Sequence, residues 1–351
     1  MGEDRAGAEP LGSGHCSPGT GGTMPGRWAS AVASLAVVGL LLGSLLLAAV
    51  RVGDPGARRL IELASLSPLG LPLAGAALLV ALVLRALGGP RRAVVVSLVA
   101  AVCLVTVHAW WLAPSYAGSR PVGGPASLVV LAQNFEYGDP AALVGLVRDE
   151  DVDVLVLTDA DSGRVDPLLE AGMEELLPHS AGIGEGGAVV LSRIPVTGTE
   201  LLHAGSASRL VELEAPGLGA VTIAAVHTRP PYDPDAWRDD HEQVRTALAR
   251  VRADADRAVV VAGDLNATLA HAPVRRLVDL GFSDSAVQAN AGWSPTWPSG
   301  SHQRRLGLTV PAFAAIDHVL TSPRLVATSS RTLDLRGADH RAVLATVSVA
   351  G

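Results

Sequence analysis

The chemistry in this sequence lies in polar side chains that follow apolar, strand-like runs. The run VVVAG leads into Asp264 and Asn266, and the run SLVVLAQ leads into Asn134. Carboxylate and amide oxygens are the hard ligands that Mg²⁺ or Mn²⁺ takes, and an imidazole can transfer protons near neutral pH. Six strand boundaries carry such groups and no thiol: Asn134; Asp159 and Asp161; His227; Asp264 and Asn266; Asp317; Asp339 and His340.

Each of these groups also has an ordinary structural explanation. Asp and Asn are good helix-cap and turn residues, and a single His can simply be hydrogen-bonded at a sheet edge. Taken singly, the structural explanation is the better one, but six coincidences in one stretch of chain favour a shared site. Six other histidines lack such context and are interpreted as packing, surface or interfacial residues: His108, His179, His203, His241, His271 and His302.

The elements that must position these groups are strands alternating with a few helices. Strand-like runs occupy residues 127–133, 153–157, 187–192, 209–214, 220–227, 258–263, 315–320 and 342–349, and one helix is predicted at 140–150. A second helix begins after Asp233, which can cap it, and Trp237, Val244 and Leu248 fall on one of its faces. The strand content is too high for a simple doubly wound sheet, so an α+β sandwich of two sheets covered by helices is predicted.

The first third of the chain has a different character. Hydrophobic residues make up 49% of the 351 residues and charged residues 17%, and the mean hydropathy of +0.35 is too high for an ordinary soluble enzyme. Three apolar runs, Trp28–Val50, Leu69–Leu84 and Ala93–Leu112, predict three transmembrane helices. A signal peptide is the alternative for the first run, but that run is too long and lacks a cleavage pattern.

Charge and cysteine usage say less about function. All 27 basic side chains are Arg, and the net charge of −7 disfavours a protein that binds nucleic acid over its whole surface. The two cysteines, one in the tail and one in an apolar run, leave the compartment undecided. The arginines flanking the runs are nearly balanced, but the PRRA motif between the second and third runs favours a cytoplasmic location for that loop. The C-terminal part is therefore predicted to lie outside the cell, on a multi-pass protein of the plasma membrane.

Seven short motifs occur in a fixed order within residues 127–350. They are QNFEYGDP, DVLVLTDAD, GGAVVLSRIPV, VHTRPP, GDLNAT, AIDHVL and GADHRAV. In this order they resemble the motif series of the endonuclease/exonuclease/phosphatase superfamily, whose members include DNase-I-like nucleases, inositol polyphosphate phosphatases and sphingomyelinases. The resemblance implies a four-layer α/β sandwich, two packed mixed sheets flanked by helices, and divalent-metal-dependent hydrolysis of phosphate esters. The three predicted transmembrane helices precede the part that resembles the family.

The resemblance also implies a metal site. Asn134 and Asp159 should hold Mg²⁺ or Mn²⁺, and Asp339 should lie beside the ion. One position departs from the family, which usually has Glu where this chain has Asp159, so that the ligand is one methylene shorter. Three solutions remain open: the metal shifts, a water bridges the gap, or Asp161 replaces Asp159.

The catalytic roles follow from the same resemblance. Asp264 should orient the attacking water, and Asn266 should bond a phosphoryl oxygen. His340 should act as the acid/base imidazole, with Asp317 fixing its tautomer. His227 should contact the scissile phosphate near the leaving group.

The predicted organisation is a tail at residues 1–27, expected to be disordered, a membrane domain at 28–112, a linker at 113–126 and a catalytic domain at 127–351. The predicted function is a membrane-anchored, metal-dependent phosphoesterase with no obligate protein partner. Its substrate is a phosphate ester in nucleic acid, a phospholipid headgroup or an inositol phosphate, and the loop-like segment between Gln288 and Pro311 is expected to influence this choice. The alternative is a catalytically silent binding or sensor domain on the same fold. A calcineurin-like metallophosphoesterase ranks last, because its Asp-x-His and Gly-Asn-His motifs do not occur.

Overall fold

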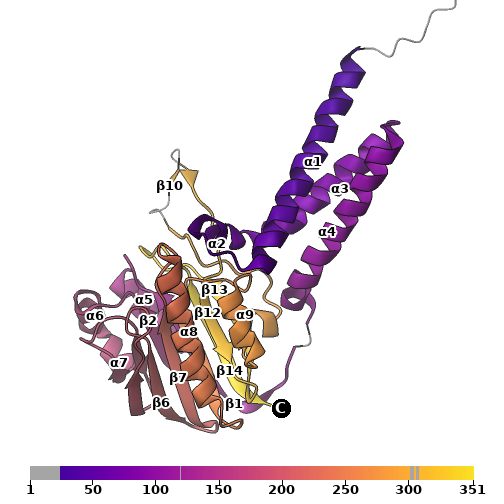
Figure 1. Cartoon of the computed structure of the whole chain (residues 1–351). Coiled ribbons are helices and arrows are strands. Elements are labelled where there is room, and N and C mark those ends of the chain that lie inside the picture. Colours follow the sequence, from indigo (N-terminus) through magenta and orange to yellow (C-terminus); the bar gives the residue numbers. More distant parts are fainter. Residues whose placement is uncertain (1–23, 119, 301–303, 306–307) are drawn as a thin grey trace, which may run out of the picture.

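A computed structural model describes residues 24–118, 120–300, 304–305 and 308–351. Most of the predicted N-terminal tail (1–23) and His302 lie outside the described residues. The chain forms a bundle of three long helices standing on a sandwich of two β-sheets (Figure 1). The bundle and the sandwich correspond to the two compositional regions of the sequence.

The bundle consists of α1 (Met24–Gly53), α3 (Gly70–Ala86) and α4 (Arg91–Ala117). The stretches Trp28–Gly53, Ser67–Ala86 and Arg91–Ala117 are long and apolar enough to cross a membrane. Helix α3 packs against both neighbours. Its small residues Ala74 and Ala77 are fully buried, which lets the helix backbones approach closely.

The connections around the bundle differ from the predicted boundaries. Helix α4 continues past Leu112 to Ala117, and the first strand already begins at Gly123, so most of the predicted linker 113–126 lies within elements. Between α1 and α3 lie a short helix, α2 (Arg58–Ala64), and a 3₁₀ turn, η1 (Ser67–Leu69). Sequence reasoning did not predict α2, because seven residues are too few for a clear helical period.

The first sheet has the strand order β13-β14-β1-β2-β4-β3. Its strands are β1 (Gly123–Asn134), β2 (Val154–Thr158), β3 (His179–Ala181), β4 (Val189–Ser192), β13 (Leu325–Leu333) and β14 (Ala342–Ala350). Strands β1 and β2 are parallel and the other pairs are antiparallel, so the sheet is mixed. Helices α5 (Pro140–Asp149), α6 (Ser162–Leu168) and α7 (Glu174–Leu176), with the short turn η2 (Leu169–Met173), accompany this sheet.

The second sheet has the order β5-β6-β7-β8-β12-β9. Its strands are β5 (Val196–Leu201), β6 (Arg209–Ala215), β7 (Gly219–His227), β8 (Ala258–Asp264), β9 (Ser283–Asp284) and β12 (Asp317–Thr321). Within this second sheet, β7 and β8 are parallel and the other pairs that the structure describes are antiparallel. Helices α8 (Pro234–Val251), α9 (Ala272–Asp279) and α10 (Ser285–Gln288) belong to this half, and a separate hairpin joins β10 (Arg304–Arg305) to β11 (Leu308–Thr309).

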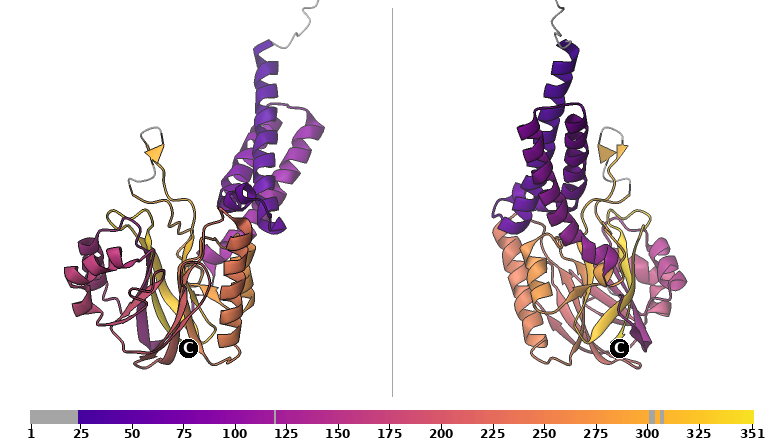
Figure 2. Two further views of the ribbon diagram at one scale, coloured as in Figure 1. Left: turned by 60° about the vertical axis from the view of Figure 1, so that its left-hand side comes forward. Right: turned by 90° about the vertical axis from the view of Figure 1, so that its right-hand side faces the viewer.

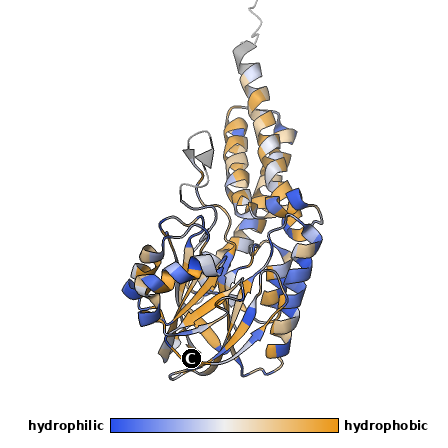
Figure 3. Ribbon diagram, turned by 90° about the vertical axis from the view of Figure 1, so that its left-hand side faces the viewer, coloured by the Kyte–Doolittle hydropathy of each residue, from blue (hydrophilic) through white to orange (hydrophobic). Residues whose placement is uncertain are grey.

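Three apolar clusters hold four layers together. One lies between the sheets and combines residues such as Val130 and Val156 with Ile223 and Val260. A second joins the first sheet to α5–α7, and a third joins the second sheet to α8 and α9. Apolar strands are sandwiched between helices with polar outer faces (Figure 3). The four-layer sandwich predicted from the sequence is therefore confirmed.

Helix α8 has the predicted cap and buried face. The Asp233 side chain accepts hydrogen bonds from the backbone N–H groups of Asp235 and Ala236, and Trp237 and Leu248 are buried. Strand β13 was not predicted, because its sequence LVATSSRTL is rich in Ser and Thr and lacks a long apolar run.

Candidate active site

The strand register brings the polar strand ends of both sheets to one edge of the sandwich. Asn134 is the last residue of β1, and its partner on β2, Thr158, directly precedes Asp159. In the second sheet, His227 pairs with Asp264 across the parallel strands β7 and β8, and Asp317 pairs with Asp264 across β8 and β12. Because parallel strands present their carboxyl ends at the same edge, residues from distant parts of the chain meet there.

Two of these residues adopt a backbone conformation that few side chains tolerate. Asp159 has a φ of 50° and Asn266 a φ of 45°, in the left-handed region where Asp and Asn are the most common non-glycine residues. Gly263, with a φ of 131°, precedes Asp264 at a point where an added Cβ would lie 2.2 Å from the Val226 carbonyl oxygen. The glycine of the GDLN motif is thus required by the close approach of β7 and β8.

A cleft of about 1000 Å³ opens at this edge. Seven of the eight residues predicted for the site line it: Asn134, Asp159, His227, Asp264, Asn266, Asp339 and His340. The eighth, Asp317, lies behind His340 and is bonded to it. Asp161 does not line the cleft; its side chain caps α6 by accepting from the Arg164 N–H, and it is 63% exposed. Of the two acids in the TDAD motif, Asp159 is therefore the one that faces the site.

On the side of the cleft next to β1 and β2, two carboxylates converge on one amide. The Asn134 Nδ2 group donates to Asp159 Oδ2 at 2.9 Å and to Asp264 Oδ2 at 3.0 Å. His227 Nε2 lies 3.7 Å from Asp159 Oδ2, so that four predicted residues form one connected group. Asn266 is tied to the same group, because its backbone N–H donates to Asp264 Oδ1 at 2.7 Å and its Nδ2 group donates to Asp264 Oδ2 at 3.4 Å.

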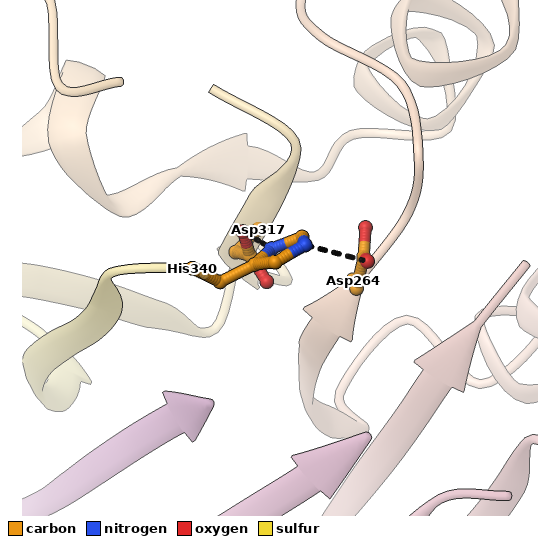
Figure 4. A group of neighbouring side chains, drawn as sticks. All are labelled: Asp264, Asp317 and His340. Carbon is orange, nitrogen blue, oxygen red and sulfur yellow. Dashed lines mark hydrogen bonds and ion pairs between the residues drawn. The ribbon is translucent and has the colours of Figure 1, made fainter. Parts of the chain in front are cut away.

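On the opposite side, Asp317 and His340 form a buried pair (Figure 4). The Nδ1 atom of His340 is 2.8 Å from Asp317 Oδ2, and its Nε2 atom faces Asp264 Oδ2 at 3.9 Å. Burial would lower the pKa of His340, but the charge of Asp317 and its hydrogen bond raise the pKa to about 10. Burial, reinforced by the nearby Asp317 carboxylate, raises the pKa of Asp264 to about 6. The pair thus fixes one ring nitrogen and aims the other at Asp264.

The donor set of the cleft fits a small, hard divalent cation. Asp264, Asp317 and His340 offer ligand atoms that all lie within 4.8 Å of one another. Asp159 offers further carboxylate oxygens, and within the described part of the chain only histidines form ion pairs with Asp159 and Asp264. A cation would relieve the unbalanced negative charge.

Other positioning residues were not found from the sequence. His318 bonds Asp284 Oδ2 at 2.7 Å through Nδ1 and the Ala267 carbonyl at 2.9 Å through Nε2, which holds the turn after Asn266. Glu136 lines the cleft immediately after the Asn134 motif.

The loop after His227 is held by a buried acid. The guanidinium of Arg229 donates to both carboxylate oxygens of Asp240, at 2.6 and 2.8 Å, and the Arg229 backbone N–H donates to Asp240 Oδ2 at 2.9 Å. Asp240 was not singled out because, in the sequence, it is one of several charged residues on an amphipathic helix.

The fold and the site together define a class of protein: a sandwich of two mixed sheets with acids, amides and imidazoles gathered at one edge. The sequence profile described as "Endonuclease/Exonuclease/phosphatase family" matches residues 131–341. This chain belongs to that family. No curated protein matches the chain.

Solved structures share the fold at low sequence identity. An endonuclease/exonuclease/phosphatase family protein from Leptotrichia buccalis is 15% identical with a TM-score of 0.50, over 63% of this chain and 99% of that chain. A conserved protein of unknown function from Enterococcus faecalis gives the same identity and TM-score, over 63% and 100%. TDP2 from Caenorhabditis elegans is 15% identical with a TM-score of 0.50, over 70% and 82%. These similarities show the fold alone.

Proposed function

We propose that the protein is a membrane-anchored phosphoesterase that uses Mg²⁺ or Mn²⁺ to hydrolyse phosphodiester or phosphomonoester bonds. The observation that carries this proposal is the convergence of Asn134, Asp159, Asp264 and His340 in one cleft, with Asp317 bonded behind His340. Hydrolysis of a phosphate ester needs charge neutralisation at phosphorus, a positioned water and a group that handles protons. Residues suited to each task are present.

Asn134 and Asp159 would hold the metal, with Asp339 beside it. When bound, the cation neutralises charge on the phosphoryl oxygens and lowers the barrier to attack by water. Asp159 is one methylene shorter than the Glu usual in the family, yet its carboxylate lies within hydrogen-bonding distance of Asn134.

The remaining residues orient the reactants and move protons. Asp264, held between Asn134 and Asn266, would orient the attacking water, and Asn266 would donate to a phosphoryl oxygen. His340 would exchange the proton at Nε2 while Asp317 holds Nδ1, which fixes the tautomer. His227, beside Asp159, would contact the scissile phosphate near the leaving oxygen.

We also propose an orientation in the membrane, from the arginines that flank the helices of the bundle. The N-terminal end of α1 and the loop at residues 87–90 lie at the end of the bundle away from the sandwich (Figure 1). Arg85, Arg91 and Arg92 flank that loop, and under the positive-inside rule they support our proposal that the loop is cytoplasmic and the sandwich lies outside the plasma membrane. Protease added to intact cells should then cleave the C-terminal domain, and its protection would overturn this orientation.

The test of the activity is hydrolysis of a soluble phosphodiester and a soluble phosphomonoester by the purified full-length chain. We expect turnover with Mn²⁺ or Mg²⁺ and none after removal of divalent ions. In the variant Asp264→Asn we expect a loss of about 10³-fold or more, since water orientation is removed at the reacting centre. Equal rates in this variant and the native chain would refute the assigned roles.

A further inference from the structure

One wall of the cleft comes from the membrane domain rather than from the family fold. Helix α2 and the turn after it, which connect α1 to α3, line the cleft opposite the strand ends. The lining residues of this wall are Arg58, Arg59, Glu62, Leu63, Ser65 and Leu66. They belong to the part of the chain that precedes the family match at residues 131–341.

Apolar packing fixes this wall against the sandwich. Ile61 on α2 is 2% exposed and belongs to the apolar cluster that includes Trp237 and Val244 of α8. Because α2 shares its core with α8, it behaves as part of the sandwich and not as a loose loop.

Hydrogen bonds hold the same segment. His271 accepts the Thr268 N–H at Nδ1, so its Nε2 carries the proton and donates to the Ile61 carbonyl at 2.9 Å. Arg238 donates to the Pro55 carbonyl at 2.6 Å, and Arg276 pairs with Asp54 at 3.1 Å.

The wall also lies where two candidate spans end. Helix α1 ends at Gly53 and the next apolar stretch begins at Ser67, so α2 occupies the level at which those helices would leave a bilayer. The view in Figure 1 shows α2 between the bundle and the upper edge of the sheets. In Figure 2 the β10–β11 hairpin rises from the sandwich on this same side. With α2 as one of its walls, the cleft lies beside the end of the bundle at which the first two candidate spans end and begin.

The chemistry of the wall suits an amphiphile with an anionic head. Arg59 is 84% exposed, and the Arg58 guanidinium stacks over the Tyr232 ring at 4.4 Å. Arg and Tyr at the end of a span are typical of the interface between headgroups and water. Apolar side chains complete the lining: Leu63, Leu66, Trp297, Phe313 and Ile316.

We infer that the substrates are phosphate esters of bilayer lipids, taken from the leaflet beside α2, with α2 as the surface that recognises the headgroup. This inference rests on the proposed phosphoesterase function. In the reaction, the oxygen of water bonds to phosphorus, the bond from phosphorus to the ester oxygen breaks, and that oxygen leaves with a proton as an alcohol. Arg58 and Arg59 contact the anionic headgroup while the leucines contact the acyl region.

The test compares substrates presented to the full chain reconstituted in vesicles with Mn²⁺. One set of vesicles is phosphatidylcholine containing phosphatidylglycerol, phosphatidic acid or phosphatidylinositol; the soluble arms are glycerol phosphate, inositol phosphate, bis-p-nitrophenyl phosphate and plasmid DNA. We expect kcat/KM for at least one vesicle lipid to exceed that for every soluble ester by about tenfold or more. Preference for DNA or for a free phosphate ester would overturn the lipid inference and leave the phosphoesterase proposal standing. No hydrolysis of any substrate would overturn both.

A charge reversal on α2 separates recognition from chemistry. Arg59→Glu should raise KM for the vesicle lipid about tenfold with a much smaller change in kcat, because basic residues at an anionic surface attract it. Arg245→Glu is the matched control, since Arg245 also pairs with a Glu three residues away on a helix but does not line the cleft. The control should leave KM within about twofold of the native value. Equal effects of the two variants, or no effect of Arg59→Glu, would contradict a headgroup-recognising α2.

Discussion

Two buried Asp–His pairs lie side by side in this protein, and only one of them faces the cleft. Asp317 bonds His340, and Asp284 bonds His318, with Oδ2 to Nδ1 distances of 2.8 and 2.7 Å. Their second ring nitrogens differ. His318 Nε2 bonds the Ala267 carbonyl, whereas His340 Nε2 faces the Asp264 carboxylate at 3.9 Å, which is too long for a hydrogen bond.

The difference between the two pairs cannot be recognised from the sequence. The dipeptide Asp-His occurs at residues 317–318 and at 339–340, yet the pair that faces the cleft joins Asp317 to His340. Neighbouring residues of a strand point to opposite faces, so Asp317 points toward His340, which lines the cleft, while His318 points to the other side of β12. A histidine whose two nitrogens are both bonded is structural, and one with a nitrogen directed at a cleft is available for proton transfer.

The protonation of the two rings follows from their partners. Both partners of His318 are acceptors, so the ring donates from both nitrogens as an imidazolium; against the effect of burial, Asp284 raises the pKa of His318. The pKa of His340 is also raised, to about 10, by Asp317. Folding therefore favours the protonated form of His340, a contribution to stability that is complete below pH 6.5 and is lost as the pH rises through about 10.

The largest predicted effect is the loss of kcat on replacing His340, and His318 provides the comparison. His340→Gln should lower kcat on a soluble phosphodiester by about 10³-fold, because the acid/base group is lost. His318→Gln should reduce kcat by less than about tenfold and lower Tm instead, since it removes a charged, buried hydrogen bond. Steady-state kinetics and thermal unfolding of both variants separate the roles. Equal losses of kcat in the two variants would contradict the catalytic role of one pair and the structural role of the other.

Replacing the aspartate of each pair tests the same comparison between the two Asp–His pairs. Asp317→Asn should lower kcat by about 10²-fold and bring the pKa of His340 down from about 10, because burial then acts without the opposing carboxylate. Histidine NMR signals recorded against pH measure this shift. Asp284→Asn is the control, and it should leave the His340 titration in place. An unchanged His340 pKa in Asp317→Asn would show that the cross-strand pair does not set its protonation.

Replacing the acid proposed to bind the metal should have a smaller effect than replacing His340 or Asp317. Asp159→Ala should weaken Mn²⁺ binding by about tenfold to a hundredfold, whereas Asp161→Ala should have no effect beyond a loss of about 1 kcal/mol in stability through the α6 cap. Calorimetric titration with Mn²⁺ measures both. Weaker binding in Asp161→Ala but not in Asp159→Ala would exchange the two assignments.

The smallest effect concerns stability in the absence of metal. The pKa of Asp264 is raised to about 6, so its contribution to stability is present below the unfolded pKa and is lost as the pH rises through about 6. At neutral pH the buried carboxylate then destabilises the fold. Asp264→Asn in a chelating buffer at pH 7.5 should melt at the same temperature as the native chain or above it. A lower Tm would show that Asp264 holds the fold together instead of serving the site.

The sequence predicted the sandwich and the cleft residues for different physical reasons. Apolar runs such as 258–263 must be buried strands, and the motif order carried the resemblance. The pairing of Asp317 with His340 follows from strand register, which local patterns do not specify. Helix α2 was missed because its docking depends on Ile61 and His271, residues 210 positions apart that carry no local signal. His271 was interpreted as a surface or packing residue, and it is a buried residue that bonds the Ile61 carbonyl on α2.

The most direct test is to follow Mn²⁺ binding and ester hydrolysis in the same titration of the metal-free, full-length chain. If the cleft is a hydrolytic centre, Mn²⁺ binding and the rate of ester hydrolysis should rise together with one midpoint. Chelation should then return the rate of hydrolysis to background. Metal binding that saturates without hydrolysis of any phosphate ester would contradict the account and assign the cleft to binding or sensing. Hydrolysis that persists in the chelator would contradict the metal-dependent site.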